Sequence, residues 1–282
     1  MDAEYVPARP PAALRRHVLR YLGYTEHADR PLRRRQAPAS GVALILGFHP
    51  LGLSGPALPT TTASAFVGGL GDTWVLTEFT GPQAGVQVDL TPLGAYTLLG
   101  GRALPGGAVP GLDQLEDPAL ASLPDRLAAT PSWAARFALV SAFVGDRLLG
   151  EGARHPAPEV AHAWHRLARS GGRASVAGLA AETGWSRRHL QSRFTTQIGL
   201  GPRTAGRVLR FAGAARLVGG TPAPLAEIAA TCGYADQPHL SREFRSLAGI
   251  SPAAFRAEWA TTAPEFPNVH DEDRTAEQDL AS

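Results

Sequence analysis

The histidines at positions 155, 162 and 165 are the first residues whose type and spacing suggest chemistry. His162 and His165 are three positions apart, so on a helix they would share one face and could bind a metal ion through their imidazole nitrogens. No cysteine or carboxylate pattern accompanies them at the spacing of a zinc site. We therefore interpret them as surface histidines and expect neither a metal nor a cofactor.

Cys232 is the one cysteine of the sequence, which excludes an internal disulfide and a multi-cysteine metal site. An exposed thiol could sense oxidants. Cys232 lies at helical spacing from Leu225, Ile228 and Ala229, however, on the apolar face of an expected helix. We predict that it is a small residue of the core.

Catalytic and phosphate-binding patterns are weak. Glu116 and Asp117 adjoin a loop proline without a catalytic setting, and the sequence has no Gly-x-Ser-x-Gly elbow and no convincing triad. The glycines of residues 68–71 and 100–101 lack the spacing of phosphate-binding loops, so we interpret them as tight turns. The sequence therefore predicts that the protein is not an enzyme.

A stronger pattern begins at Leu225, where apolar residues recur at i, i+3, i+4 and i+7 and predict a short helix. Gly233 can end that helix in a left-handed conformation, and Asp236 can cap a second helix. The second helix would bury Leu240, Phe244 and Leu247 at helical spacing. Its other face would then present hydrogen-bonding and cationic side chains, namely Gln237, Ser241, Arg242 and Arg245. This pattern predicts a helix-turn-helix unit.

The same unit occurs about fifty residues upstream. Gly184-Trp185 corresponds to Gly233-Tyr234, and the Gly199–Pro202 stretch corresponds to Gly249–Pro252. This agreement indicates an internal repeat. Thr204–Val218 lacks proline and has regularly spaced apolar residues, so it predicts one helix that links the two units.

Two tandem helix-turn-helix units on a linking helix resemble the AraC family of bacterial transcription regulators, over about Gly172–Trp259. The segment IAATCGYADQPHLSREFRSLAGISPAAFR is similar to that family's signature. Pro238 departs from the family, in which this position is often polar, so a base contact there is in doubt. The resemblance implies base contacts in the major groove from Arg188, Gln191 and Ser192 in the first unit and from Gln237, Ser241 and Arg242 in the second.

Candidate phosphate contacts come from histidines and arginines of the two units and of the linking helix. His189 and His239 occupy equivalent positions, where they could contact phosphate or brace the start of the helix. Arg207 and Arg210 on the linking helix could neutralise phosphates or only solvate the surface. The expected phosphate-contacting residues are Arg187, His189, Arg193, Arg207, Arg210, His239 and Arg245.

The charge distribution agrees with a module that binds a polyanion. All 27 basic residues are arginine, and residues 173–259 hold 11 of them against 5 acidic residues. Residues 260–282 hold 1 against 6. No apolar run is long enough for a membrane span, and the N-terminus lacks the apolar segment of a signal peptide, so we expect a cytoplasmic protein.

The N-terminal part predicts short strands joined by Gly/Pro turns. Ala12–Leu22 fits a short helix, and the arginine run 33–35 lies among turn residues and reads as a solvated loop. The expected strands are 41–49, 63–68, 74–79 and 86–90, and the expected helices are 91–99, 118–128, 131–149 and 159–169. Residues 81–94 also resemble a stretch of the N-terminal domain in one subset of AraC-type regulators.

These observations together predict an α+β protein. It would comprise an effector or dimerisation domain with a mixed antiparallel sheet and helices (1–112), a helical connector (113–171), an all-α DNA-binding domain (172–260) and an acidic, disordered tail (261–282). The expected function is sequence-specific regulation of transcription on double-stranded DNA. RNA polymerase, a small-molecule effector and a second copy of the chain are candidate partners. The alternative is an enzyme domain fused to a DNA-binding module, but residues 1–172 lack the nucleophilic cysteines of alkylation-response methyltransferases.

Overall fold

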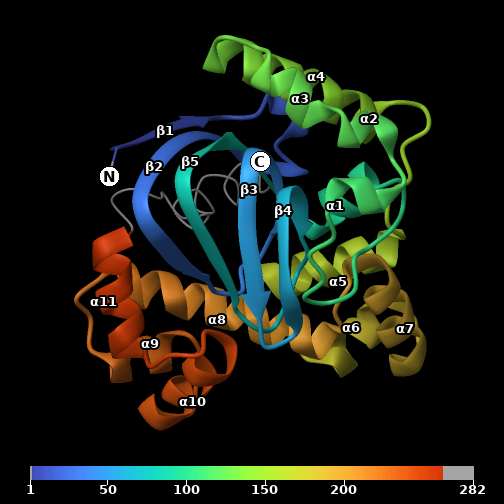
Figure 1. The fold of residues 1–282 in the computed structure, drawn as a ribbon. Helices are drawn as coiled ribbons and strands as arrows, with labels where there is room; N and C mark the ends of the chain where they lie inside the picture. The colour runs from blue at the N-terminus through green and yellow to red at the C-terminus, as the bar shows by residue number, and fades with distance from the viewer. Residues whose placement is uncertain (1, 263–282) are drawn as a thin grey trace.

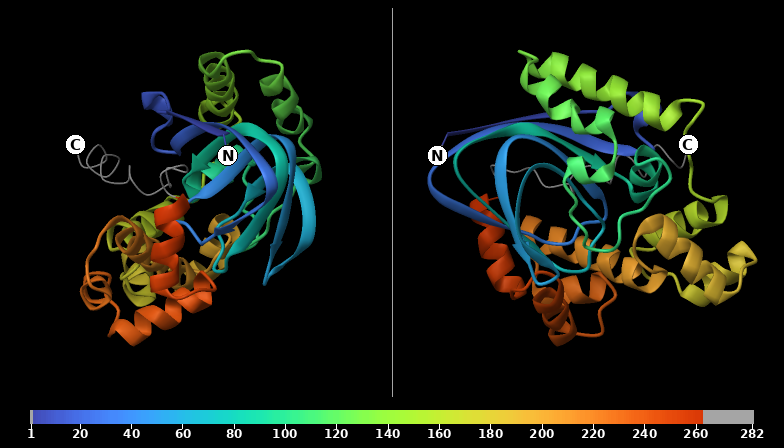
Figure 2. Two further views of the ribbon diagram at one scale, coloured as in Figure 1. Left: turned by 60° about the vertical axis from the view of Figure 1, so that its left-hand side comes forward. Right: turned by 45° about the vertical axis from the view of Figure 1, so that its right-hand side comes forward.

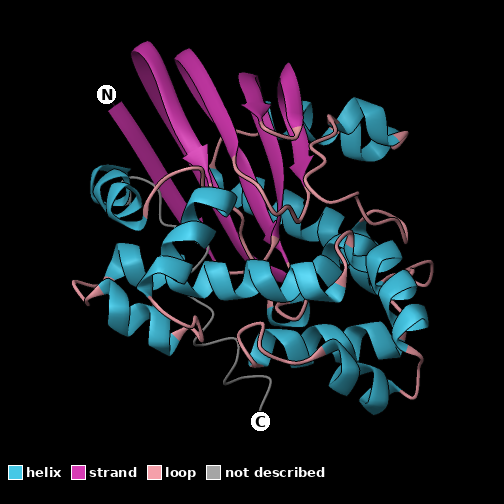
Figure 3. Cartoon of the chain, turned by 90° about the horizontal axis from the view of Figure 1, so that it is seen from below, coloured by secondary structure: helices cyan, strands magenta, loops and turns pink. Residues whose placement is uncertain are grey.

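The N-terminal half of the chain is built around one curved antiparallel sheet. The structure is a computed structural model that describes residues 2–262. Five strands pair in the order β1-β2-β5-β3-β4, which can be followed by the labels in Figure 1. Figure 3 shows the strands side by side in one sheet. Their bounds are β1 (Asp2–Ala8), β2 (Val18–Gln36), β3 (Val42–Gly55), β4 (Leu58–Gly68) and β5 (Val75–Leu90).

A group of helices covers one face of the sheet. Gly23 of β2 leaves room for the ring of Trp133, and Tyr21 stacks on Phe137 with 6.2 Å between ring centroids. The last helix of the group therefore packs directly on β2. The helices after the sheet are α1 (Pro92–Leu98), α2 (Pro118–Ala121), α3 (Leu123–Ala128) and α4 (Trp133–Leu149).

The remaining helices form a layer on the other side of the sheet (Figures 1 and 2). One hydrophobic cluster runs from the sheet into the first part of this layer, and a second cluster lies around Phe211 and Phe244. The layer comprises α5 (Pro158–Arg169), α6 (Val176–Thr183), α7 (Arg187–Ile198), α8 (Pro202–Gly220), α9 (Leu225–Thr231), α10 (Gln237–Leu247) and α11 (Pro252–Thr262). The α+β class and the order of sheet before helices are confirmed.

Two N-terminal predictions are wrong. Ala12–Leu22 is not a helix: a single 3-10 turn at Ala12–Leu14 precedes β2. The arginine run 33–35 is not a loop either, because it lies within β2 opposite residues 76–78 of β5. Arg33 pairs with Glu78, and Arg34 forms an ion pair with the buried Glu26 at 2.7 Å. This charged stretch therefore forms part of a strand because it pairs with β5, which lies far away in the sequence.

Other predictions hold with changed bounds. The strands expected at 74–79 and 86–90 are one strand, β5, and the helix expected at 118–128 is divided into α2 and α3. Thr91 caps α1, accepting a hydrogen bond from Gly94 N at 3.0 Å. The tail expected after residue 260 lies largely outside the described residues. Within 2–262, none of the helices is both long and apolar enough to cross a membrane.

Helix α5 belongs to the helical layer by its contacts. Its side chains Val160, Trp164 and Leu167 are buried, and the helix packs against α6, α7 and α8. At its end, Gly172 has φ +77° and lies directly against Gly206 of α8. The expected domain boundary at residue 172 stays a prediction, and this packing favours a boundary near Pro158.

Candidate nucleic-acid interface

The two helix-turn-helix units fold around matching turns. Gly184 and Gly233 have φ of +70° and +74°, a conformation that is nearly free for glycine alone. Ser186 Oγ then accepts a hydrogen bond from His189 N at 3.2 Å, and Asp236 Oδ1 accepts one from His239 N at 2.6 Å. These caps fix the start of α7 and of α10. The turn and caps predicted for the second unit are therefore confirmed, and the first unit has the same arrangement.

Each second helix buries one face against its unit. Leu190 and Phe194 of α7 are fully buried, as are Leu240 and Phe244 of α10. Phe244 meets Phe211 of α8 edge to face, with 4.9 Å between ring centroids. Since side chains at i and i+4 share a helix face, the other, outward sides of each helix carry the residues that can meet DNA.

The expected base-contacting residues lie on those outward faces. Arg188, Gln191 and Ser192 are exposed on α7, while Gln237 and Arg242 are exposed and Ser241 half-buried on α10. Gln191 Nε2 donates a hydrogen bond to Thr195 Oγ1 at 3.3 Å. Among residues 2–262, no hydrogen bond or ion pair engages the guanidinium groups of five arginines on these helices, which are Arg187, Arg188, Arg193, Arg242 and Arg245. These cations are free to meet DNA.

The paired histidines brace the two turns. His189 meets Trp185 edge to face at 4.5 Å, and His239 meets Tyr234 in the same way at 5.2 Å. His239 Nδ1 also accepts a hydrogen bond from Ala235 N at 3.4 Å. Of the two roles left open for them, the structure provides the bracing one, and contact with phosphate stays a prediction.

Arg207 and Arg210 of α8 are engaged inside the protein. Arg207 Nε donates to Glu243 Oε2 at 2.8 Å, and its Nη2 donates to Ser246 Oγ at 2.7 Å. The guanidinium of Arg210 lies 5.6 Å from the centre of the Tyr234 ring. Both arginines therefore tie the linking helix to the second unit, a role that the sequence alone did not reveal. Whether either also reaches phosphate stays a prediction.

Cys232 was considered as a possible oxidant sensor and His162 as a possible metal ligand, and both have structural surroundings. Cys232 is half-buried at the end of α9 and not in the centre of the core, so its predicted place is only partly right. Burial raises the pKa of its thiol and so keeps it protonated near neutral pH. His162 Nε2 lies 2.8 Å from Glu182 Oε2, which also accepts from Arg166, and this cluster joins α5 to α6.

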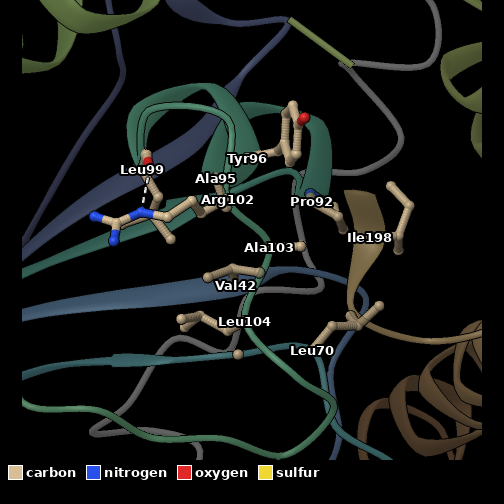
Figure 4. A pocket seen from close by; sticks show the side chains of 11 residues that line it. Val42, Leu70, Pro92, Ala95, Tyr96, Leu99, Arg102, Ala103, Leu104 and Ile198 are labelled. Atoms are coloured by element: carbon tan, nitrogen blue, oxygen red, sulfur yellow. Dashed lines mark hydrogen bonds between the residues drawn. The ribbon is translucent and has the colours of Figure 1, made fainter. Parts of the chain in front are cut away.

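The N-terminal domain contacts the same turn in both units. After α7, Gly199 lies against the carbonyl oxygen of Leu104; after α10, Gly249 lies against Trp74 and Arg35. Figure 4 shows a small pocket where the end of α7 meets the sheet domain, lined by Tyr96, Arg102, Leu104 and Ile198 among others. Its volume of about 10 Å³ suits at most a water molecule.

A family model described as a helix-turn-helix domain matches residues 179–258. The chain carries an AraC-type DNA-binding domain. The resemblance seen in the sequence is thereby confirmed, and the protein is a DNA-binding transcription regulator. The match spans both turns and both outward faces, and it ends within α11.

Solved structures also resemble the chain. ToxT from Vibrio cholerae O395, bound to (E)-4-(8-methylnaphthalen-1-yl)but-3-enoic acid, is 9% identical over 92% of this chain and 100% of its own, with a TM-score of 0.50. That likeness shows a shared fold, in which a sheet domain is followed by a helical domain. The DNA-binding domain of AdpA in complex with a target DNA is 28% identical over 39% of this chain and 100% of its own, with a TM-score of 0.36.

A transcriptional regulator from Chromobacterium violaceum with an AraC-type DNA-binding domain is 28% identical over 36% of this chain and 93% of its own. Its TM-score is 0.34. No curated protein sequence matches this chain.

Proposed function

We propose that the protein reads two successive major grooves on one face of DNA, one with α7 and one with α10. The observation that carries this proposal is the repeated unit itself, with equivalent caps, buried faces and free arginines on both helices. Helix α8 packs against both units and fixes their separation. Adjacent grooves on one face lie roughly 34 Å apart, one turn of B-DNA.

Specificity would come from the polar side chains on the outward side of the first half of each helix. Arg188 and Arg242 suit guanine, whose O6 and N7 accept two hydrogen bonds from one guanidinium. Gln191 and Gln237 suit adenine N6 and N7 in the same way. Ser192 and Ser241 can donate to or accept from several bases. The remaining free arginines would contact phosphates and supply affinity without sequence preference.

Pro238 limits what the start of α10 can do. It occupies the first turn of the helix, where the missing N–H costs little, and its ring offers no hydrogen bond to a base. We therefore infer that α10 reads bases with Gln237, Ser241 and Arg242, and that Pro238 itself makes no polar contact with a base.

The N-terminal domain would adjust the DNA-binding units through its contacts with Gly199 and Gly249. A small-molecule effector, a second copy of the chain and RNA polymerase remain candidate partners for that control. ToxT, which shares the fold, has been solved with a small carboxylic acid bound. A thermal-shift screen of small carboxylic acids, read together with DNA affinity, would identify an effector of this class.

The proposal is tested by footprinting the full chain on DNA selected from a random pool. Two protected subsites about one helical turn apart would support it. A single subsite that persists when α10 is mutated would refute the role of the second unit.

A further inference from the structure

The free edge of strand β4 lacks the usual protection of an edge strand. Exposed edges offer unpaired N–H and C=O groups, and proteins normally guard them with charged residues or proline. The opposite edge strand, β1, carries Glu4 and Pro7. Strand β4 has no charged residue between Leu58 and Gly68, and only Pro59 near its start interrupts the row of donors. The β4 edge is therefore open to another strand.

One end of this edge already holds an added segment of the same chain. Gly111 forms an antiparallel bridge with Phe66, Val67 N donates to Pro110 O at 3.1 Å, and Gly69 N donates to Ala108 O at 3.0 Å. The chain then turns away into the 3-10 helix Leu112–Leu115. Because backbone groups alternate in direction along a strand, the N–H and C=O groups of Thr61 and Ala63 point to the same side as those of Val67, and beyond the added segment that side is open.

A cleft of about 770 Å³ runs along the open part of the edge. All eight residues from Leu58 to Ala65 line one wall, and the facing wall comes from α3 and the 3-10 helix before it. Phe48 and Leu112 add apolar surface. An edge strand that faces a helix across a groove is a geometry that binds peptides by strand addition.

The charge of the cleft indicates which kind of extended peptide segment could bind in it. Its lining includes two carboxylates, Asp113 and Asp125, and no basic side chain, and both acids are exposed. Residues 263–282 hold six acidic residues against one arginine, so this chain's own tail would be repelled. The β4 strand of a second copy carries no cation to meet these acids.

We propose that this groove, bounded by β4 residues 58–65 and the wall of Asp113 and Asp125, binds an extended basic peptide segment of a partner protein. The peptide adds as an antiparallel strand to Thr61 and Ala63. Its basic side chains meet the two carboxylates. The small side chains of β4 let the peptide backbone approach without a steric barrier.

The test uses the full chain and a fluorescein-labelled peptide of nine residues, in which valine and threonine alternate around two lysines. Anisotropy should show saturable binding. Ala63→Pro should weaken it at least ten-fold, because it removes an outward N–H and places a ring in the path of the peptide. Ala63→Val, the matched control, should bind as the native protein does. Asp113→Asn with Asp125→Asn should weaken binding and reduce its dependence on salt.

Unchanged circular dichroism and DNA affinity of Ala63→Pro would show that the fold is intact. If that variant does not fold, the native protein is tested instead with a probe that is N-methylated at alternate backbone nitrogens. Because N-methylation removes the backbone donors, this probe should not bind. Equal affinity for the N-methylated probe, or for a probe with glutamate in place of lysine, would overturn the proposal. So would absence of binding, or a dimer of the native protein that Ala63→Pro abolishes, since the edge would then serve a second copy.

Discussion

Arg207 on the linking helix α8 and Glu243 on the second recognition helix α10 form an ion pair, with 2.8 Å between Nε and Oε2. Ser246 accepts a second hydrogen bond from the same guanidinium at 2.7 Å. Both side chains of the ion pair are less than a third exposed, at 31% and 18%. Water therefore screens the pair only partly, and the ion pair holds α10 against α8.

Replacing Arg207 should destabilise the protein. We expect Arg207→Ala to lower the free energy of unfolding by about 1–3 kcal/mol, because Glu243 loses its charged partner. Arg203→Ala is the matched control on the same helix, since Arg203 is exposed and should change stability by less than about 0.5 kcal/mol. Urea unfolding measures both. Equal stability of the two variants would contradict this account of the ion pair.

The same variant separates two roles of Arg207. If the residue only holds α10, Arg207→Ala should leave the slope of log affinity against log salt unchanged. If it also contacts phosphate, that slope should decrease by about one. DNA binding measured from low to moderate salt distinguishes the outcomes.

The protonation of His17 should make the stability of the protein depend on pH. Burial, together with repulsion from the nearby Arg16 and His155, lowers its pKa to about 4. His17 Nε2 also accepts a hydrogen bond from Arg16 at 3.1 Å, which requires the neutral ring. Because the folded-state pKa lies below the unfolded value of about 6.5, unfolding takes up a proton between these pH values. Stability should therefore fall as pH drops from about 6.5 to 4.

The loss assigned to His17 over that interval is at most about 3 kcal/mol. His17→Gln should flatten the pH profile of urea unfolding between pH 4.5 and 7. A profile as steep as that of the native protein would show that other groups cause it.

Local signals made the DNA-binding units predictable. Gly233 and Asp236 determine the turn and the cap within a few residues, and the repeat confirms each feature a second time. The N-terminal errors arise where partners are distant. The spacing of Leu14, Val18 and Leu22 fits a helix, yet Val18 and Leu22 pair with residues of β5 some seventy positions away. Arg34 likewise lies in a strand, where its guanidinium group donates hydrogen bonds to Glu26 and to Tyr5.

For the candidate site, too, the sequence predicts the features that depend on local spacing and misses those that depend on distant partners. Outward faces follow from helical period, so the exposed Arg188 and Arg242 could be found from sequence. The engagement of Arg207 with Glu243 could not, because it joins residues 36 positions apart across two helices. Only their packing brings them together.

Helix α5 sets the smallest fragment that should bind DNA. Residues 158–262 should fold and bind duplex DNA, with affinity that falls steeply as salt rises. Residues 173–262 lack Trp164 and Leu167, which fill the core of the first unit, so this shorter fragment should be poorly folded. Circular dichroism and DNA titration compare the two. A stable, fully active shorter fragment would show that α5 is dispensable.

The central claim is that α7 and α10 each read one subsite. Selection from a randomised DNA pool, carried out with the native chain, Arg188→Ala and Arg242→Ala, tests it most directly. Each variant should lose about 1–3 kcal/mol of binding free energy and relax base preference in one subsite only, a different one for each variant, with the subsites about one helical turn apart. Base preference that stays unchanged in both variants, with affinity lowered alike for all sequences, would contradict the assignment of these arginines as base readers.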